Sequence, residues 1–129
     1  MVFEHFALNV PDAPAMAKWY VAHCGAKVAR SMKQPPFTHF LADRTGRTFV
    51  ELYTNASQPF DDFRSRHPLL FHFAFAVADA RAAKEDLIAA GASLVEEVRP
   101  DPLSLLVTMR DPWGVPLQVC QRSEPMVRL

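Results

Sequence analysis

The chain has 129 residues, half of them hydrophobic and 22% charged, which are the proportions of an ordinary globular protein. Fourteen Lys and Arg residues balance fourteen Asp and Glu residues, so no net charge favours a nucleic acid as partner. The chain does not begin with a basic segment, and its longest apolar stretch, residues 69–78, is too short to span a bilayer; we therefore expect a cytoplasmic protein without a membrane partner.

The first part of the chain, about residues 1–54, predicts a module with the order strand, helix and three strands. Residues 2–10 mix apolar and polar positions as a strand does, and Asp12 then offers a helix N-cap. An Ala-rich segment with apolar residues at helical spacing, residues 13–24, predicts a helix that ends at Gly25. Turns rich in Pro and Gly separate three short expected strands, at residues 26–31, 37–42 and 47–53.

A polar, proline-flanked segment, residues 55–69, predicts a linker, with at most one helical turn at residues 60–64. The second module, about residues 70–124, repeats the order of the first. Its expected elements are a strand at 70–77, a helix at 80–90 and strands at 93–98, 105–110 and 115–122. Modules this small bury little surface alone, so we expect one α+β domain, residues 1–129, made of two tandem βαβββ modules.

An internal repeat relates the two modules. The nine residues from His5 to Ala13 return as His72 to Ala80, with six of the nine identical. The relationship extends further, because Glu51 follows His5 at the same distance in sequence at which Gln118 follows His72. Two halves that each carry a His and a later carboxylate or amide at one spacing predict a pseudo-symmetric site.

These four residues have side chains suited to a metal ion. Glu51 lies within the apolar segment Phe49 to Tyr53, and burying its carboxylate without a cation or metal would cost several kcal/mol. Two imidazoles and two side-chain oxygens suit a borderline divalent ion and leave positions for water or substrate. The alternative is that each residue only forms hydrogen bonds within a sheet or lies on a solvated strand face.

Other polar residues carry weaker signals. His39 alternates on an expected strand and could line the same cavity, although a His that faces solvent or has its hydrogen bonds satisfied is the preferred interpretation. Arg110 could approach an anionic substrate, but we expect an Arg at the surface end of a strand. Cys24 and Cys120 form no CxxC motif, and we expect both to be reduced and structural.

The sequence resembles the vicinal oxygen chelate superfamily, which includes glyoxalase I, methylmalonyl-CoA epimerase, extradiol dioxygenases and antibiotic-resistance proteins. The matching segments are His5 to Asp12, Trp19-Tyr20 with Gly25, Phe49 to Tyr53, His72 to Asp79 and Asp111 to Gln118. The resemblance implies paired modules whose mixed sheets curl around a metal-binding cavity, with His5, Glu51, His72 and Gln118 as ligands. It also implies a divalent ion such as zinc, nickel, cobalt, manganese or iron, a small-molecule substrate and a homodimer.

Gln118 departs from glyoxalase I and many relatives, which carry Glu at this position. An amide oxygen can bind a metal but cannot accept a proton, so Glu51 becomes the expected catalytic proton shuttle. The resemblance therefore implies a metal-dependent lyase or isomerase of the glyoxalase type that acts on a substrate with vicinal oxygens. Two alternatives remain: a non-enzymatic protein that binds an antibiotic or metabolite, and an iron-dependent extradiol-type dioxygenase, against which a fourth protein ligand argues.

Overall fold

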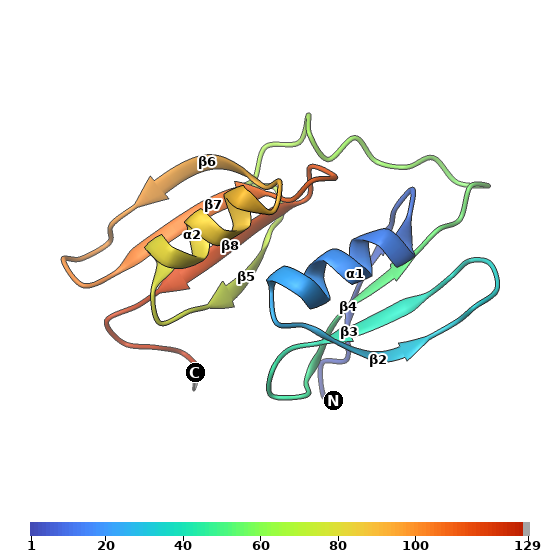
Figure 1. Cartoon of the computed structure of the whole chain (residues 1–129), viewed down its shortest axis with the longest axis horizontal. Helices are drawn as coiled ribbons and strands as arrows, with labels where there is room; N and C mark the ends of the chain where they lie inside the picture. The colour runs from blue at the N-terminus through green and yellow to red at the C-terminus, as the bar shows by residue number, and fades with distance from the viewer. Residues whose placement is uncertain (128–129) are drawn as a thin grey trace. The chain divides into compact units, whose positions relative to one another are not determined.

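Each half of the chain folds into one helix packed on a four-stranded mixed sheet, within the residues 1–127 that the computed structural model describes (Figure 1). The chain divides into two compact units, which meet between Asp61 and Asp62 in the sequence. The predicted α+β fold with two βαβββ modules is confirmed. A metal-binding cavity enclosed by the sheets stays a prediction. Neither described helix is long and apolar enough to cross a membrane.

The first unit has the spatial strand order β1-β4-β3-β2, in which β1 runs parallel to β4 and the other neighbours are antiparallel. Its elements are β1 (Phe6–Asn9), α1 (Ala13–His23), β2 (Lys27–Ser31), β3 (His39–Ala42) and β4 (Thr48–Tyr53). The Asp12 carboxylate accepts a hydrogen bond of 2.9 Å from the Ala15 amide, which is the predicted N-cap of α1.

The second unit repeats this topology as β5-β8-β7-β6, with β5 parallel to β8. Its elements are β5 (Phe73–Ala76), α2 (Ala80–Ala89), β6 (Ser93–Val98), β7 (Leu105–Arg110) and β8 (Pro116–Gln121). Asp79 caps α2 by accepting hydrogen bonds from the amides of Arg81 and Ala82 at 2.9 and 3.0 Å. The two N-caps thus occupy equivalent positions of the repeat.

On the strand next to the parallel edge strand of each unit, two buried apolar residues flank a half-buried polar one. Val50 and Leu52 are buried on β4, whereas Glu51 between them is only half-buried; Leu117 and Val119 on β8 stand in the same relation to Gln118. Because successive strand residues point to opposite faces, Glu51 and Gln118 lie on the sheet face away from the helix. We call this side of each sheet the open face.

Two strands begin three or more residues later than the sequence predicts. The strand expected at residues 2–10 starts at Phe6, and the strand expected at residues 70–77 starts at Phe73. Residues 68–70 form a turn, in which the Leu70 amide donates a 2.9 Å hydrogen bond to the His67 carbonyl. His5 and His72 therefore each lie one residue before a strand, so the repeat holds at the corrected boundaries.

The second half of the expected linker is attached to the second unit. Residues 63–65 form a turn and no helix, and Phe63 is buried. The Arg110 guanidinium donates hydrogen bonds to the carbonyls of Phe63, Gly114 and Arg66 at 2.8, 3.1 and 2.6 Å. Both interpretations of Arg110, as an anion-binding or a surface residue, are therefore replaced by a structural role, in which it holds the turn before β5 against the turn before β8.

Candidate functional site

The repeat places Glu51 and Gln118 in the same register of their sheets. Glu51 pairs with Ala7 on β1, and Gln118 pairs with Ala74 on β5. His5 and His72 lie two residues before these alanines, and alternation puts each His on the open face with its carboxylate or amide. We call His5 with Glu51 the first half-site, and His72 with Gln118 the second half-site.

The first half-site contains a direct contact between imidazole and carboxylate. His5 Nε2 lies 3.2 Å from Glu51 Oε2, and the two side chains are 25% and 22% exposed. His5 Nδ1 lies 3.2 Å from Oε2 of the exposed Glu4, yet this buried nitrogen has no hydrogen-bond partner among the described residues. The Phe40 ring meets the imidazole edge to face, with ring centroids 5.2 Å apart. His5 is thus packed and faces two carboxylates.

This contact has two chemical interpretations. A neutral imidazole can donate a proton from Nε2 to the Glu51 carboxylate, and Nδ1, which has no hydrogen-bond partner among the described residues, then carries the lone pair. In the other interpretation, Nε2 and the carboxylate oxygen are both available to bind one metal ion.

In the second half-site the backbone sets the histidine tautomer. His72 Nδ1 lies 3.0 Å from the Pro68 carbonyl oxygen, which can only accept a hydrogen bond, so Nδ1 carries the proton. The neutral ring then has its lone pair on Nε2. Metal-binding histidines in proteins are commonly held in this way by a backbone carbonyl. His72 is exposed, so Nε2 is accessible to an ion or a ligand.

Both ends of the Gln118 amide have protein partners. Its nitrogen donates a 3.0 Å hydrogen bond to Thr108 Oγ1, and its oxygen accepts one of 3.1 Å from Cys120 Sγ. Burial raises the pKa of the Cys120 thiol, which favours the protonated, donating form. The amide oxygen keeps a second lone pair, so Gln118 can still bind a cation.

The partners of Gln118 were not identified from the sequence. Thr108 faces Gln118 across β7 and β8, and that pairing is known only once the register is known. Cys120 is two residues from Gln118 on the same strand. Strand alternation therefore predicts that the two side chains share a face, but it does not predict the hydrogen bond between them. In the first unit Phe40 stands opposite Glu51, where the second unit has Thr108. The carboxylate therefore has an aromatic neighbour and the amide a polar one.

The remaining histidine of interest does not join this site. His39 pairs with Leu52, so it lies on the helix side of its sheet, and its Nδ1 is 2.7 Å from the Phe37 carbonyl oxygen. Among residues 1–127, no group of three or more His, Cys, Asp or Glu side chains is arranged to hold a metal. The structure brings His5 and Glu51 together, whereas the described residues show no hydrogen bond between His72 and Gln118, each of which has other partners.

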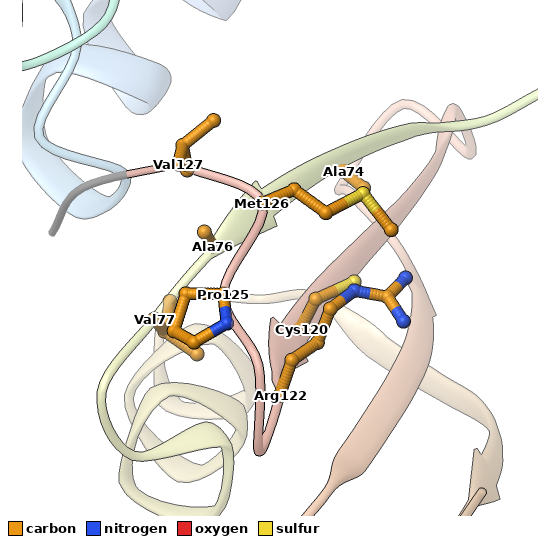
Figure 2. Close-up of a pocket in the computed structure, with 8 residues that line it drawn as sticks. All are labelled: Ala74, Ala76, Val77, Cys120, Arg122, Pro125, Met126 and Val127. Carbon is orange, nitrogen blue, oxygen red and sulfur yellow. The ribbon is translucent and has the colours of Figure 1, made fainter.

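An apolar pocket lies beside the second half-site (Figure 2). It has a volume of about 180 Å³ and lies on the open face, bounded by the segment that follows β8. Its lining residues are Ala74, Ala76, Val77, Cys120, Arg122, Pro125, Met126 and Val127. Since Ala74 and Cys120 lie two residues beyond His72 and Gln118, the pocket continues the face that carries the second half-site.

The fold and the repeated half-sites agree with a family assignment. Residues 2–119 match the model of the Glyoxalase/Bleomycin resistance protein/Dioxygenase superfamily, and the chain belongs to this superfamily. No curated protein matches the chain. The superfamily contains both enzymes and non-enzymatic binding proteins, so membership alone leaves the activity open.

Solved structures support the fold. A glyoxalase/bleomycin resistance protein/dioxygenase domain from Frankia sp. EAN1pec has a TM-score of 0.66 and 19% identity, over 95% of this chain and 98% of that one. TnmS3, an antibiotic-binding protein from Streptomyces sp. CB03234, has a TM-score of 0.69 and 16% identity, over 95% and 97%. A glyoxalase I mutant from Zea mays has a TM-score of 0.72 and 23% identity, over 93% of this chain and 44% of that one.

Proposed function

We propose that this chain binds a divalent metal ion through His5, Glu51, His72 and Gln118 and acts as a lyase or isomerase of the glyoxalase type. The observation that carries the proposal is the 3.2 Å approach of His5 Nε2 to Glu51 Oε2, which places two side-chain donor atoms close enough to bind one ion. The substrate would be a small molecule with oxygens on adjacent carbons.

The side chains fit such an ion chemically. Two imidazole nitrogens, one carboxylate and one amide oxygen form a donor set that suits zinc, nickel, cobalt, manganese or iron. The Pro68 carbonyl fixes the His72 tautomer that presents Nε2, which is the form a metal ligand needs. With one carboxylate among the four ligands, the loaded centre would keep one positive charge and favour an anionic substrate.

Glu51 is the group that would move protons. It is the one candidate ligand with a carboxylate, and its side chain is 22% exposed, so a substrate can reach it. Glu51 would accept the proton from a carbon next to a carbonyl group, while the C–H electron pair shifts toward the carbonyl oxygen, and would return the proton to the neighbouring carbon. A bound metal would act as a Lewis acid that stabilises the negative charge on the substrate oxygens.

Metal analysis and proton exchange test this function together. Wild-type protein purified without chelators is expected to contain about one divalent ion per chain, and His72→Ala is expected to lose it. Glu51→Gln should lower exchange of the α-proton of an α-hydroxycarbonyl or thiohemiacetal probe into D₂O by about 10²–10⁴-fold. Glu85→Gln, on the exposed side of α2, is the matched control and should change neither measurement. Full exchange in Glu51→Gln would exclude Glu51 as the proton shuttle.

A second function is a non-enzymatic small-molecule binder. Two observations favour it: the Gln118 amide is already occupied at both ends by Thr108 and Cys120, and an apolar pocket lies beside it. The antibiotic-binding protein TnmS3, which shares the fold, shows that this class occurs among similar structures. Metal-free protein that keeps its structure and binds ligands unchanged by added zinc or nickel would favour the binder over the enzyme.

A further inference from the structure

We infer that the pocket beside β5 and β8 is a binding site for a small organic acid, which inserts an apolar group of about the size of a benzene ring and places its carboxylate against Arg122. The inference goes beyond the proposed function, because no candidate metal ligand lines the pocket. It would hold for an enzyme or for a binding protein.

The size and lining of the pocket define the apolar part of the ligand. Its volume of about 180 Å³ compares with an apolar cavity of about 150 Å³ that is known to take up benzene. The space exists because β5 presents the small side chains of Ala74 and Ala76 at its edge. Pro125 and Met126, on the segment after β8, supply apolar walls (Figure 2).

Arg122 defines the polar part of the ligand. It is the one charged residue among the described residues that line the pocket, and Figure 2 shows its side chain folded back beside Cys120. No carboxylate within residues 1–127 forms an ion pair with Arg122. A half-buried guanidinium on an apolar wall gains from a bidentate carboxylate, whose two oxygens match its planar fork.

The pocket also lies at a defined distance from the second half-site. Cys120 follows Gln118 by two residues on β8, which corresponds to about 7 Å along a strand. A compact acid in the pocket could therefore extend toward Gln118 and His72. The chemical class that fits is a monocarboxylic acid with a phenyl or branched aliphatic group, and not a long chain or a polyanion.

Phenylacetate is the probe for this site, tested on the full chain after treatment with chelator. Isothermal titration calorimetry and ¹⁵N heteronuclear NMR should show binding at least tenfold tighter than for benzyl alcohol, which lacks the charge, and for acetate, which lacks the ring. The largest amide shifts are expected at Ala74, Ala76, Cys120 and Arg122. Equal binding of phenylacetate and benzyl alcohol, or shifts centred elsewhere, would overturn the inference.

Two substitutions separate charge from shape. Arg122→Gln should weaken phenylacetate binding at least tenfold and leave benzyl alcohol unchanged, whereas Arg81→Gln, which removes the same charge from exposed α2, should have no effect. Ala76→Leu should fill the pocket and weaken both ring-containing probes, with far-UV circular dichroism as the check on folding. If Ala76→Leu does not fold, Arg122→Gln decides: unchanged phenylacetate affinity would refute the site. Because all measurements use metal-free protein, failure here is distinct from failure of the metal proposal.

Discussion

Thr108 and Gln118 face each other on β7 and β8, and the Gln118 amide nitrogen donates a 3.0 Å hydrogen bond to the Thr108 hydroxyl. Thr108 is 3% exposed, so this hydroxyl is held in the interior of the sheet. With the nitrogen held, the amide oxygen is the end that meets Cys120. A threonine on a neighbouring strand thus determines which atom of Gln118 is available to a ligand.

Removing that hydroxyl should destabilise the protein by leaving the amide nitrogen unpaired. Thr108→Val is expected to lower the free energy of unfolding by about 1–3 kcal/mol, measured by equilibrium urea denaturation. Thr108→Ser keeps the hydroxyl and should lose less. In a double-mutant cycle with Gln118→Leu, a coupling free energy of at least about 0.5 kcal/mol is expected; additive effects of the two substitutions would show that the hydrogen bond contributes nothing.

A side chain at Gly114 should destabilise the protein for two reasons, the positive φ of its backbone and the nearby Arg64. Comparison with a substitution at Gly46 separates the two. Gly114 has φ +91°, and an added Cβ would collide with Arg64 Cγ and come within 3.1 Å of the Arg64 amide nitrogen. Gly46 has a similar φ of +88° with no atom nearby. Gly46→Ala should therefore cost about 1–2 kcal/mol from backbone strain alone, and Gly114→Ala clearly more. Equal losses in guanidinium unfolding would show that Arg64 moves aside freely.

Arg110 should protect the turn before β5 from proteolysis. Arg110→Met removes its hydrogen bonds to the carbonyls of Phe63, Arg66 and Gly114, and stability should fall by about 2–3 kcal/mol. Limited trypsin digestion should then cut after Arg64 or Arg66 several times faster than in the wild type. Arg99→Met, at an exposed position, is the control. An unchanged cleavage rate in Arg110→Met would contradict the role assigned to Arg110.

Asp101 should make stability depend on pH in the acid range. Hydrogen bonds, foremost from the Ser104 hydroxyl, hold its pKa below the ordinary value of 3.8. A carboxylate whose pKa is lower in the folded state stabilises the protein above the unfolded pKa and loses that effect as pH falls through the folded one. Asp101→Ala should therefore be less stable than the wild type at pH 7, and the difference should shrink as the pH falls below the ordinary pKa of 3.8. Urea midpoints at several pH values measure this; a constant difference would exclude the carboxylate charge as the cause.

Sequence predictions that depend on neighbouring residues were correct, and those that depend on contacts between residues distant in the chain were not. The helix starts after Asp12 and Asp79 were predicted correctly, because an N-cap depends on residues two or three positions away. The strand start at Val2 was wrong, because the pairing with β4 begins only at Phe6. The helical turn expected at residues 60–64 is absent, and the Arg110 side chain, distant in sequence, binds the Phe63 carbonyl in this segment.

The sequence alone determined the duplication, the βαβββ order and the shared spacing of the His5–Glu51 and His72–Gln118 pairs, because these depend on local pattern and on counting along the chain. Strand pairing and side-chain packing decided what surrounds each pair. In the observed strand register, Thr108 lies opposite Gln118 and Phe40 lies opposite Glu51. The same register pairs His39 with Leu52, so His39 lies on the helix side of the sheet. These contacts join residues on different strands, whose alignment is a property of the whole sheet and not of any one segment. The repeat thus specifies a symmetric framework in which Glu51 and Gln118 already differ, and tertiary contacts add different neighbours to the two halves.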